Sequence, residues 1–119
     1  MSAHRITIER VDDRVRIAWK GQTLADSRSA LRLQEGPLAP VLYFPQTDVR
    51  MDLLRRTETQ THCPFKGAAS YWSVDAPDAK MENAVWSYET PLAEVDAIAG
   101  HVAFYNELLP GIEERFGDD

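Results

Sequence analysis

The stretch Arg-Val-Arg-Ile-Ala-Trp, residues 14–19, places large apolar side chains at every second position, namely Val15, Ile17 and Trp19. Successive side chains of a β-strand point to opposite faces, so these three residues lie on one face of an extended segment. Such alternation is typical of an antiparallel sheet that packs one face against a core. The stretch therefore predicts a fold that is mainly β.

The residues on either side of this stretch extend the pattern. Before it, Ile6 and Ile8 share one face of a second extended segment, and Asp12-Asp13 follow as turn residues. Paired acids at a turn between two alternating segments predict a β-hairpin through the two strands. After it, Gly21 marks the next reversal of the chain.

Further strand signals, rich in Val and aromatic residues, recur along the chain. Gly36-Pro37 and Pro40 interrupt them as loop residues, and Pro45 ends a strand because it cannot donate to the ladder. The predicted strands are Thr23–Asp26, Ala30–Glu35, Val41–Phe44, Ala68–Val74, Val85–Tyr88 and His101–Tyr105.

Two segments between the strands favour short helices. The first lies in residues 47–56, where Thr47 or Asp48 can cap the helix. The second begins at Thr90-Pro91, a cap followed by proline at the first helical position, and Gly100 closes it. This second helix is expected to bury one stripe of residues: Leu92, Val95 and Ile98.

Short strands at regular spacing, with brief helices between them, predict a single compact antiparallel domain that is barrel-like or a folded sandwich. One or two short helices are expected within it. The 119 residues fit one domain, because domains most often have roughly 100–150 residues. The acidic tail, residues 110–119, is expected to fray or to form one helical turn.

The composition limits the partners and the compartment. The chain holds 13 Lys and Arg against 19 Asp and Glu, a net charge of −6, which disfavours non-specific nucleic-acid binding. No apolar run approaches the roughly 18 residues that span a membrane, and no secretory signal is visible. The single cysteine excludes an internal disulfide and fits a reducing compartment. We therefore expect a cytoplasmic protein with neither nucleic-acid nor membrane partners.

The charges are unevenly distributed along the chain. The first 66 residues contain 11 basic and 8 acidic residues, and the remainder contain 2 basic and 11 acidic residues. Two interpretations stay open at the level of the sequence. Either the two halves intermix on the folded surface, or the first half builds a local cationic site.

The densest block of reactive residues is Thr-His-Cys-Pro-Phe-Lys-Gly, residues 61–67. Lys66 follows Cys63 across a predicted turn, and a nearby cation favours the thiolate form of a cysteine. His62 is a poor base for this thiol, because adjacent side chains of an extended chain point to opposite faces. The alternative is that Cys63 is a small buried apolar residue. Without a second cysteine or a zinc-ligand spacing, no metal site is expected.

The position of Glu35 suggests a polar pocket. In an extended segment Glu35 shares its face with Leu31 and Leu33, and a carboxylate that continues an apolar row is costly without a partner. The alternative is that Glu35 turns outward at the end of its strand. If it does not, a pocket with acidic, basic and aromatic walls follows. Its candidate partners are Arg28, Arg32, Arg50, Arg55, Arg56 and Lys66.

Several blocks in a fixed order carry a resemblance to a known family. They are Leu24-Ala25-Asp26-Ser27, Glu35, Tyr43-Phe44-Pro45, Asp48-Val49, residues 61–67, Ala69-Ser70-Tyr71, Ala84–Tyr88 and Ala103-Phe104-Tyr105. The run from residue 19 to residue 105 resembles a bacterial and fungal family catalogued as domain of unknown function 427, also labelled nucleotidyltransferase-like. The resemblance implies a compact, mainly β single domain and brings no established activity.

The nucleotidyltransferase label can be compared with the residues. Nucleotidyl transfer uses closely spaced carboxylates to hold one or two divalent ions. The chain contains no Asp-x-Asp, and its nearest approximations are Asp48 with Asp52 and Asp75 with Asp78. The standard glycine-rich phosphate loops are also missing, so the sequence assigns no cofactor.

The family motifs nominate eight site residues in this chain. The candidate catalytic residues are Glu35, Asp48, Cys63 and Lys66. The candidate ligand-binding residues are Tyr43, Tyr71, Trp86 and Tyr88. In this hypothesis the lysine neutralises an anionic group of a ligand or raises the acidity of the thiol. The two carboxylates accept hydrogen bonds or act as an acid–base pair, and the tyrosines donate.

Two hypotheses for the function follow. The first is a pocket near the turn at Cys63–Lys66 that binds a small polar or anionic molecule, with catalysis left open. The second is a protein-interaction or scaffold module, which displays aromatic residues such as Trp72 or Trp86 and uses the motif residues mainly for structure. The first requires the motif side chains to converge on one concave surface. The oligomeric state stays open in both.

Overall fold

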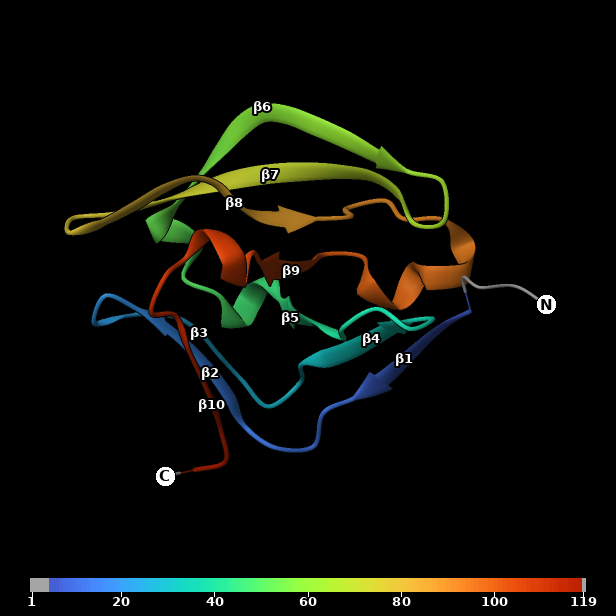
Figure 1. The fold of residues 1–119 in the computed structure, drawn as a ribbon, viewed down its shortest axis with the longest axis horizontal. Helices are drawn as coiled ribbons and strands as arrows, with labels where there is room; N and C mark the ends of the chain where they lie inside the picture. The colour runs from blue at the N-terminus through green and yellow to red at the C-terminus, as the bar shows by residue number, and fades with distance from the viewer. Residues whose placement is uncertain (1–4, 119) are drawn as a thin grey trace.

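The computed structural model describes residues 5–118 and contains ten β-strands (Figure 1). The strands are β1 Ile6–Arg10, β2 Val15–Trp19, β3 Gln22–Ser27, β4 Leu31–Glu35, β5 Val41–Pro45, β6 Leu54–Cys63, β7 Gly67–Ala76, β8 Ala79–Ser87, β9 His101–Phe104 and β10 Glu113–Phe116. Four short 3₁₀ helices join them. These are η1 Gln46–Asp48, η2 Met51–Leu53, η3 Ala93–Ile98 and η4 Asn106–Leu108.

The strands form two antiparallel sheets. One has seven strands in the order β1-β4-β5-β9-β8-β7-β6, and the other has three in the order β10-β2-β3. In Figure 1 the three-stranded sheet lies at the lower left, and the larger sheet extends from β1 below to β6 above. The prediction of a mainly β domain is confirmed, and of its two forms the folded sandwich fits, because the sheet does not close into a barrel.

Two apolar cores lie on opposite faces of the larger sheet. The first is shared with the three-stranded sheet and includes Trp19, Phe44 and Trp72. The second combines side chains of β1 and β4 with others of β7, β9 and η3. Because strands from distant positions in the sheet order contribute to this second core, the larger sheet curls strongly around it.

The predicted hairpin through the first two strands is wrong. β1 pairs with β4, from Ile6 opposite Glu35 to Arg10 opposite Leu31, whereas β2 pairs with β3 and β10. The chain bends at Asp13, but the bend carries it from one sheet to the other. The two consecutive strands pack against different cores and lie in different sheets, so they do not pair with each other.

The helices η1, η2 and η3 lie at or within the two predicted segments, whereas η4 was not predicted. All four are of the 3₁₀ type and none has a side-chain cap. In η3, Val95 and Ile98 are buried as expected. Leu92 is not, since 44% of its surface is exposed. Its backbone extends before the helix begins, which removes it from the predicted stripe.

The tail was predicted to fray or to form a helical turn, and this is also wrong. β10 pairs with β2 from Glu113 opposite Ala18 to Phe116 opposite Val15. The indole nitrogen of Trp19 also donates to the carbonyl of Pro110 at 2.9 Å. The side chains of β10 are exposed, so the tail carries no burial pattern that sequence analysis can detect.

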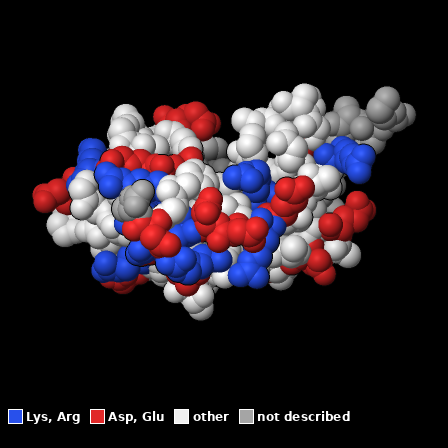
Figure 2. All heavy atoms as spheres, turned by 90° about the horizontal axis from the view of Figure 1, so that it is seen from below, with Lys and Arg blue, Asp and Glu red and all other residues white. Residues whose placement is uncertain are grey.

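Charges from the two halves of the chain intermix on the surface. Arg55 pairs with Asp75, and Arg56 pairs with Glu89, each joining a base of the first half to an acid of the second. Figure 2 shows basic and acidic residues side by side on the face seen from below. Of the two interpretations of the charge asymmetry, the structure supports intermixing. No helix in the described part of the chain is long and apolar enough to cross a membrane.

Candidate functional site

The turn between β6 and β7 positions Lys66. The amide of Lys66 donates to the carbonyl of Cys63 at 3.2 Å, and its own carbonyl accepts from the amide of Leu92 at 2.9 Å. Gly67 follows with φ +111°, a conformation that glycine adopts far more readily than other residues. The Pro and Gly of residues 61–67 therefore form the turn that the sequence predicted, and the segment before η3 fixes its backbone.

The turn brings the ammonium group of Lys66 to Glu35 at the end of β4. Nζ of Lys66 lies 2.5 Å from Oε1 of Glu35, and the side chains are only 10% and 14% exposed. Leu33 on the same face of β4 is buried, so Glu35 does continue an inward row. Among its six candidate partners, Lys66 is the one that Glu35 contacts.

This ion pair lies in a cavity of about 170 Å³. Aromatic residues form much of its wall, together with Leu33, Leu38, Ala39 and Val41. They come from β5, β7, β8 and the segments that follow β8 and β9. These aromatic residues are Tyr43, Tyr71, Trp86, Tyr88 and Tyr105.

The aromatic rings pack against one another as well as against the cavity. The ring centroids of Trp86 and Tyr105 lie 4.2 Å apart. The rings of Tyr105 and Tyr71 are nearly parallel, with their centroids 6.4 Å apart. Tyr43 meets Trp86 edge-on, and the indole nitrogen donates to the Tyr43 hydroxyl at 3.3 Å. The hydroxyl of Thr61 lies 2.8 Å from that of Tyr71. These contacts fix the wall of the cavity before any ligand arrives.

The tyrosine hydroxyls stay protonated in this environment. Burial raises the pKa of Tyr43 to about 12, and the nearby Glu35 carboxylate adds to the rise. Burial also raises the pKa of Tyr88 above its ordinary value of 10.0. The pKa of Tyr105 rises to about 12 through burial and the neighbouring Tyr71 hydroxyl. The wall therefore offers neutral hydroxyl groups that can donate and accept hydrogen bonds.

The structure brings six of the eight predicted site residues to this cavity and leaves two outside it. Asp48 lies in η1, where it accepts a hydrogen bond from the Ser27 hydroxyl at 2.7 Å. Asp48 is not among the residues that line this cavity, because η1 follows the far end of β5. Asp48 instead ties η1 to the end of β3.

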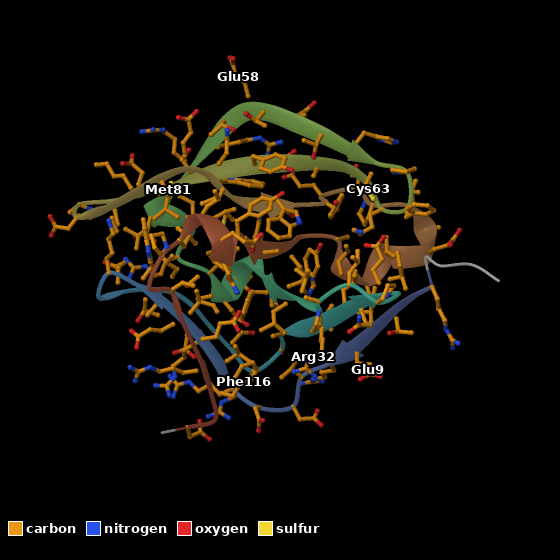
Figure 3. All side chains as sticks on the ribbon, in the orientation of Figure 1. Glu9, Arg32, Glu58, Cys63, Met81 and Phe116 are labelled. Atoms are coloured by element: carbon orange, nitrogen blue, oxygen red, sulfur yellow. The ribbon has the colours of Figure 1, made fainter. Side chains whose placement is uncertain are left out.

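Cys63 is close to the cavity without lining it. It lies at the end of β6, beside the turn that Figure 3 shows, and packs against the second core. Its neighbour His62 is exposed and points to the other face of the strand, as expected from the alternation. Cys63 therefore fits the apolar role better than the role of a nucleophile.

Sequence analysis missed Tyr105 as a site residue. The block Ala103-Phe104-Tyr105 is one of the family motifs, and its alternation predicts a strand. Alternation along this block distinguishes the two aromatic residues. Phe104 belongs to the first core, and Tyr105 packs against the second. A tyrosine that follows a buried strand on the face of Tyr43 and Tyr71 is a candidate wall residue.

The side chains of the cavity determine which interactions it can offer. Among the described residues, no group of three or more His, Cys, Asp or Glu lies close enough to hold a metal ion. The cavity offers a cation and a carboxylate side by side, with hydroxyl groups and aromatic faces around them. Such a set can bind and orient a small molecule that has both a hydrogen-bond donor and an acceptor.

Comparison with known proteins places this site in a family. No curated protein matches the chain. A family model described as "Domain of unknown function (DUF427)" matches residues 7–115, which include every residue that lines the cavity. The match confirms the resemblance seen in the sequence blocks. The chain therefore belongs to the DUF427 family.

Proposed function

We propose that this domain binds a small polar ligand in the cavity around Lys66 and Glu35. The observation that carries the proposal is the nearly buried ion pair in the cavity wall, surrounded by four tyrosines and a tryptophan. A buried ion pair contributes little net stability, because the cost of desolvating two charges offsets their attraction. Stability alone therefore does not account for the pair, whereas a ligand that interacts with both charges does.

The charges of the pair favour one kind of ligand. Lys66 and Glu35 cancel each other, so a neutral ligand leaves no uncompensated charge inside the cavity. An amide group suits the site, because its carbonyl can accept from the ammonium and its N–H can donate to the carboxylate. An anion would approach Lys66 against the repulsion of Glu35. Of the polar and anionic ligands expected from the sequence, we therefore favour the neutral polar class.

The experiment compares three small probes by NMR titration of the labelled protein. Acetamide is expected to shift the resonances of Lys66, Tyr43 and Trp86, and acetate and methylammonium are expected to do so less at equal concentration. Glu35→Gln keeps the shape of the side chain but removes its charge, and it should change this order of preference. Lys80→Met is the matched control, because it removes an exposed lysine paired with Asp75.

A second candidate function is the scaffold role, and one observation favours it. Lys66 joins three elements, since its ammonium contacts β4 and its backbone contacts both β6 and the segment before η3. If Lys66→Met lowers the melting temperature and none of the three probes shifts the cavity resonances of the wild-type protein, the motif is structural. Acetamide shifts that Glu35→Gln alters would support ligand binding instead.

A further inference from the structure

A second, larger cavity lies against the other face of the seven-stranded sheet. Its volume is about 540 Å³, and it is bordered by residues of β2, β4, β5, η4 and β10. Apolar side chains form much of its wall, among them Leu42, Phe44, Phe104 and Phe116. Figure 3 labels two of its lining residues, Arg32 from β4 and Phe116 from β10, in the lower part of the molecule.

The alternation of β5 explains why neighbouring residues line different cavities. Tyr43 points to the second core and lines the small cavity, whereas its neighbour Phe44 points to the first core and lines the large one. In the same way β4 sends Glu35 to the small cavity and Arg32 to the large one. One sheet therefore has the ion pair of Lys66 and Glu35 in a small chamber on one face, and a larger chamber lined by Leu42, Phe44, Phe104 and Phe116 on the other.

The two cavities share four lining residues near the point where the ladder between β5 and β9 ends. The register between these strands covers only Phe44 opposite Val102 and Pro45 opposite His101. Beyond these pairs the ladder ends, although β5 still includes Val41. The residues that line both cavities are Ala39 and Val41 on the β5 side and Trp86 and Tyr105 on the β9 side.

We propose that the ligand is an amphipathic amide whose polar head lies at Lys66 and Glu35 and whose apolar body passes Trp86 and Tyr105 into the larger cavity. This inference rests on the proposed function and adds the substrate class to it. The amide head uses the ion pair, and an aromatic or aliphatic body contacts Phe116 and the other apolar residues of the second chamber. Trp86 lines both cavities, so its indole can contact the body of such a ligand.

The charged residues of the larger cavity are compatible with this class of ligand. Arg32, Glu107 and Glu114 border it together with Asn106, whose side chain donates to Glu114 at 3.2 Å. Arg32 comes from β4, Asn106 and Glu107 from η4, and Glu114 from β10. An apolar body therefore contacts the phenylalanines, and polar groups remain available for the far end of a longer ligand.

The experiment measures the affinities of acetamide and phenylacetamide, which share the head and differ in the body. Burying a phenyl group is expected to tighten binding by about tenfold or more. Phe116→Ala should weaken the binding of phenylacetamide by about threefold or more and leave the affinity for acetamide unchanged. Leu108→Ala is the matched control, because Leu108 is exposed to a similar degree, 40% against 46%, and lines neither cavity.

Nuclear Overhauser effects in the wild-type protein provide a second measurement that needs no variant to fold. The phenyl protons of phenylacetamide should contact the rings of Phe104 or Phe116. Equal affinities for the two probes, or phenyl contacts confined to the tyrosines of the small cavity, would overturn the inference and leave the proposed function standing. Absence of acetamide binding, or affinities for both probes that Glu35→Gln leaves unchanged, would overturn both proposals.

Discussion

At the scale of single residues, the contact between Lys66 and Glu35 links the fold to the proposed site. The two side chains come from β4 and from a turn that is 31 positions later in the sequence, and little water reaches them. Removing one member leaves the other charge buried without a partner, which costs more than the pair itself contributes. The stability of the domain is therefore sensitive to single substitutions here.

We expect Lys66→Met to lower the free energy of unfolding by about 3 kcal/mol, because Glu35 then carries an uncompensated buried charge. Glu35→Gln should cost a similar amount, and the double variant should recover much of the loss. Urea unfolding of the four proteins gives the coupling energy. Arg50→Met is the control, since Arg50 and Asp52 form an exposed pair and should contribute nothing measurable. Strictly additive losses in the double variant would contradict the coupling.

Tyr43 makes the stability depend on alkaline pH. Its pKa rises from 10.0 to about 12 in the folded state, so the folded protein holds the proton more tightly than the unfolded chain. The stabilisation is complete below pH 10 and is lost as the pH rises toward 12, by on the order of 2 kcal/mol. Tyr43→Phe should flatten this part of the stability profile. A variant that loses stability over this range as steeply as wild type would contradict the assignment.

The sequence allowed part of this site to be predicted at the residue scale. Alternation placed Glu35 on an inward face, and the structure agrees. Alternation could not choose its partner, because all six candidate bases lie on segments whose positions depend on the tertiary fold. The same holds for Asp48. Its membership of a family motif does not determine which side of the molecule η1 occupies, so its distance from the cavity could not be predicted.

At the scale of elements, the turn from β6 to β7 carries the site. Gly67 sits there at φ +111°, and an added Cβ would lie 3.5 Å from the backbone of Pro91 and Leu92, which is ordinary contact. The cost of a side chain at this position is therefore conformational strain rather than a clash. Any relaxation of that strain moves Lys66, the adjacent residue.

We expect Gly67→Ala to destabilise the protein by about 1–3 kcal/mol through its positive φ. Gly111→Ala is the matched control, because Gly111 has φ +80° and nothing near its Cβ position. Both variants should lower the melting temperature, but only Gly67→Ala should shift the ring resonances of Tyr43 and Trp86 in NMR spectra. Equal effects of the two variants on these rings would show that the turn does not position the cavity.

The elements also show why strands are easier to predict than their partners. The alternation of Val15, Ile17 and Trp19 identified β2 within its observed bounds, and that of Ile6 and Ile8 identified β1. Period-two alternation tells which side chains share a face, but it says nothing about which core the face meets. β1 faces the second core and β2 the first, so the two strands separate at a turn that locally fits a hairpin. β10 was missed because its exposed side chains form no pattern.

At the scale of the whole molecule, the net charge of −6 conceals a paired surface. Arginines of the first half contact acids of both halves, so basic and acidic residues that are separated along the chain lie next to each other on the surface. The arginine hydrogen bonds lower the pKa of Asp26 and Glu89, and Lys80 lowers the pKa of Asp75. These carboxylates then link stability to acidic pH.

We expect the stability of the protein to fall as the pH decreases through the ordinary carboxyl range, whose values are 3.8 for Asp and 4.5 for Glu. Each of these carboxyl groups has a lowered pKa in the folded state, so its contribution is complete above the ordinary value and is lost as the pH falls through the folded one. Urea unfolding at a series of pH values measures this slope. Glu89→Gln should make it shallower, because Arg56 then has no carboxylate to hold in the ionised form. High salt should flatten it as well, since exposed pairs are screened. A slope that neither the variant nor the salt changes would place the acid sensitivity in groups other than these surface pairs.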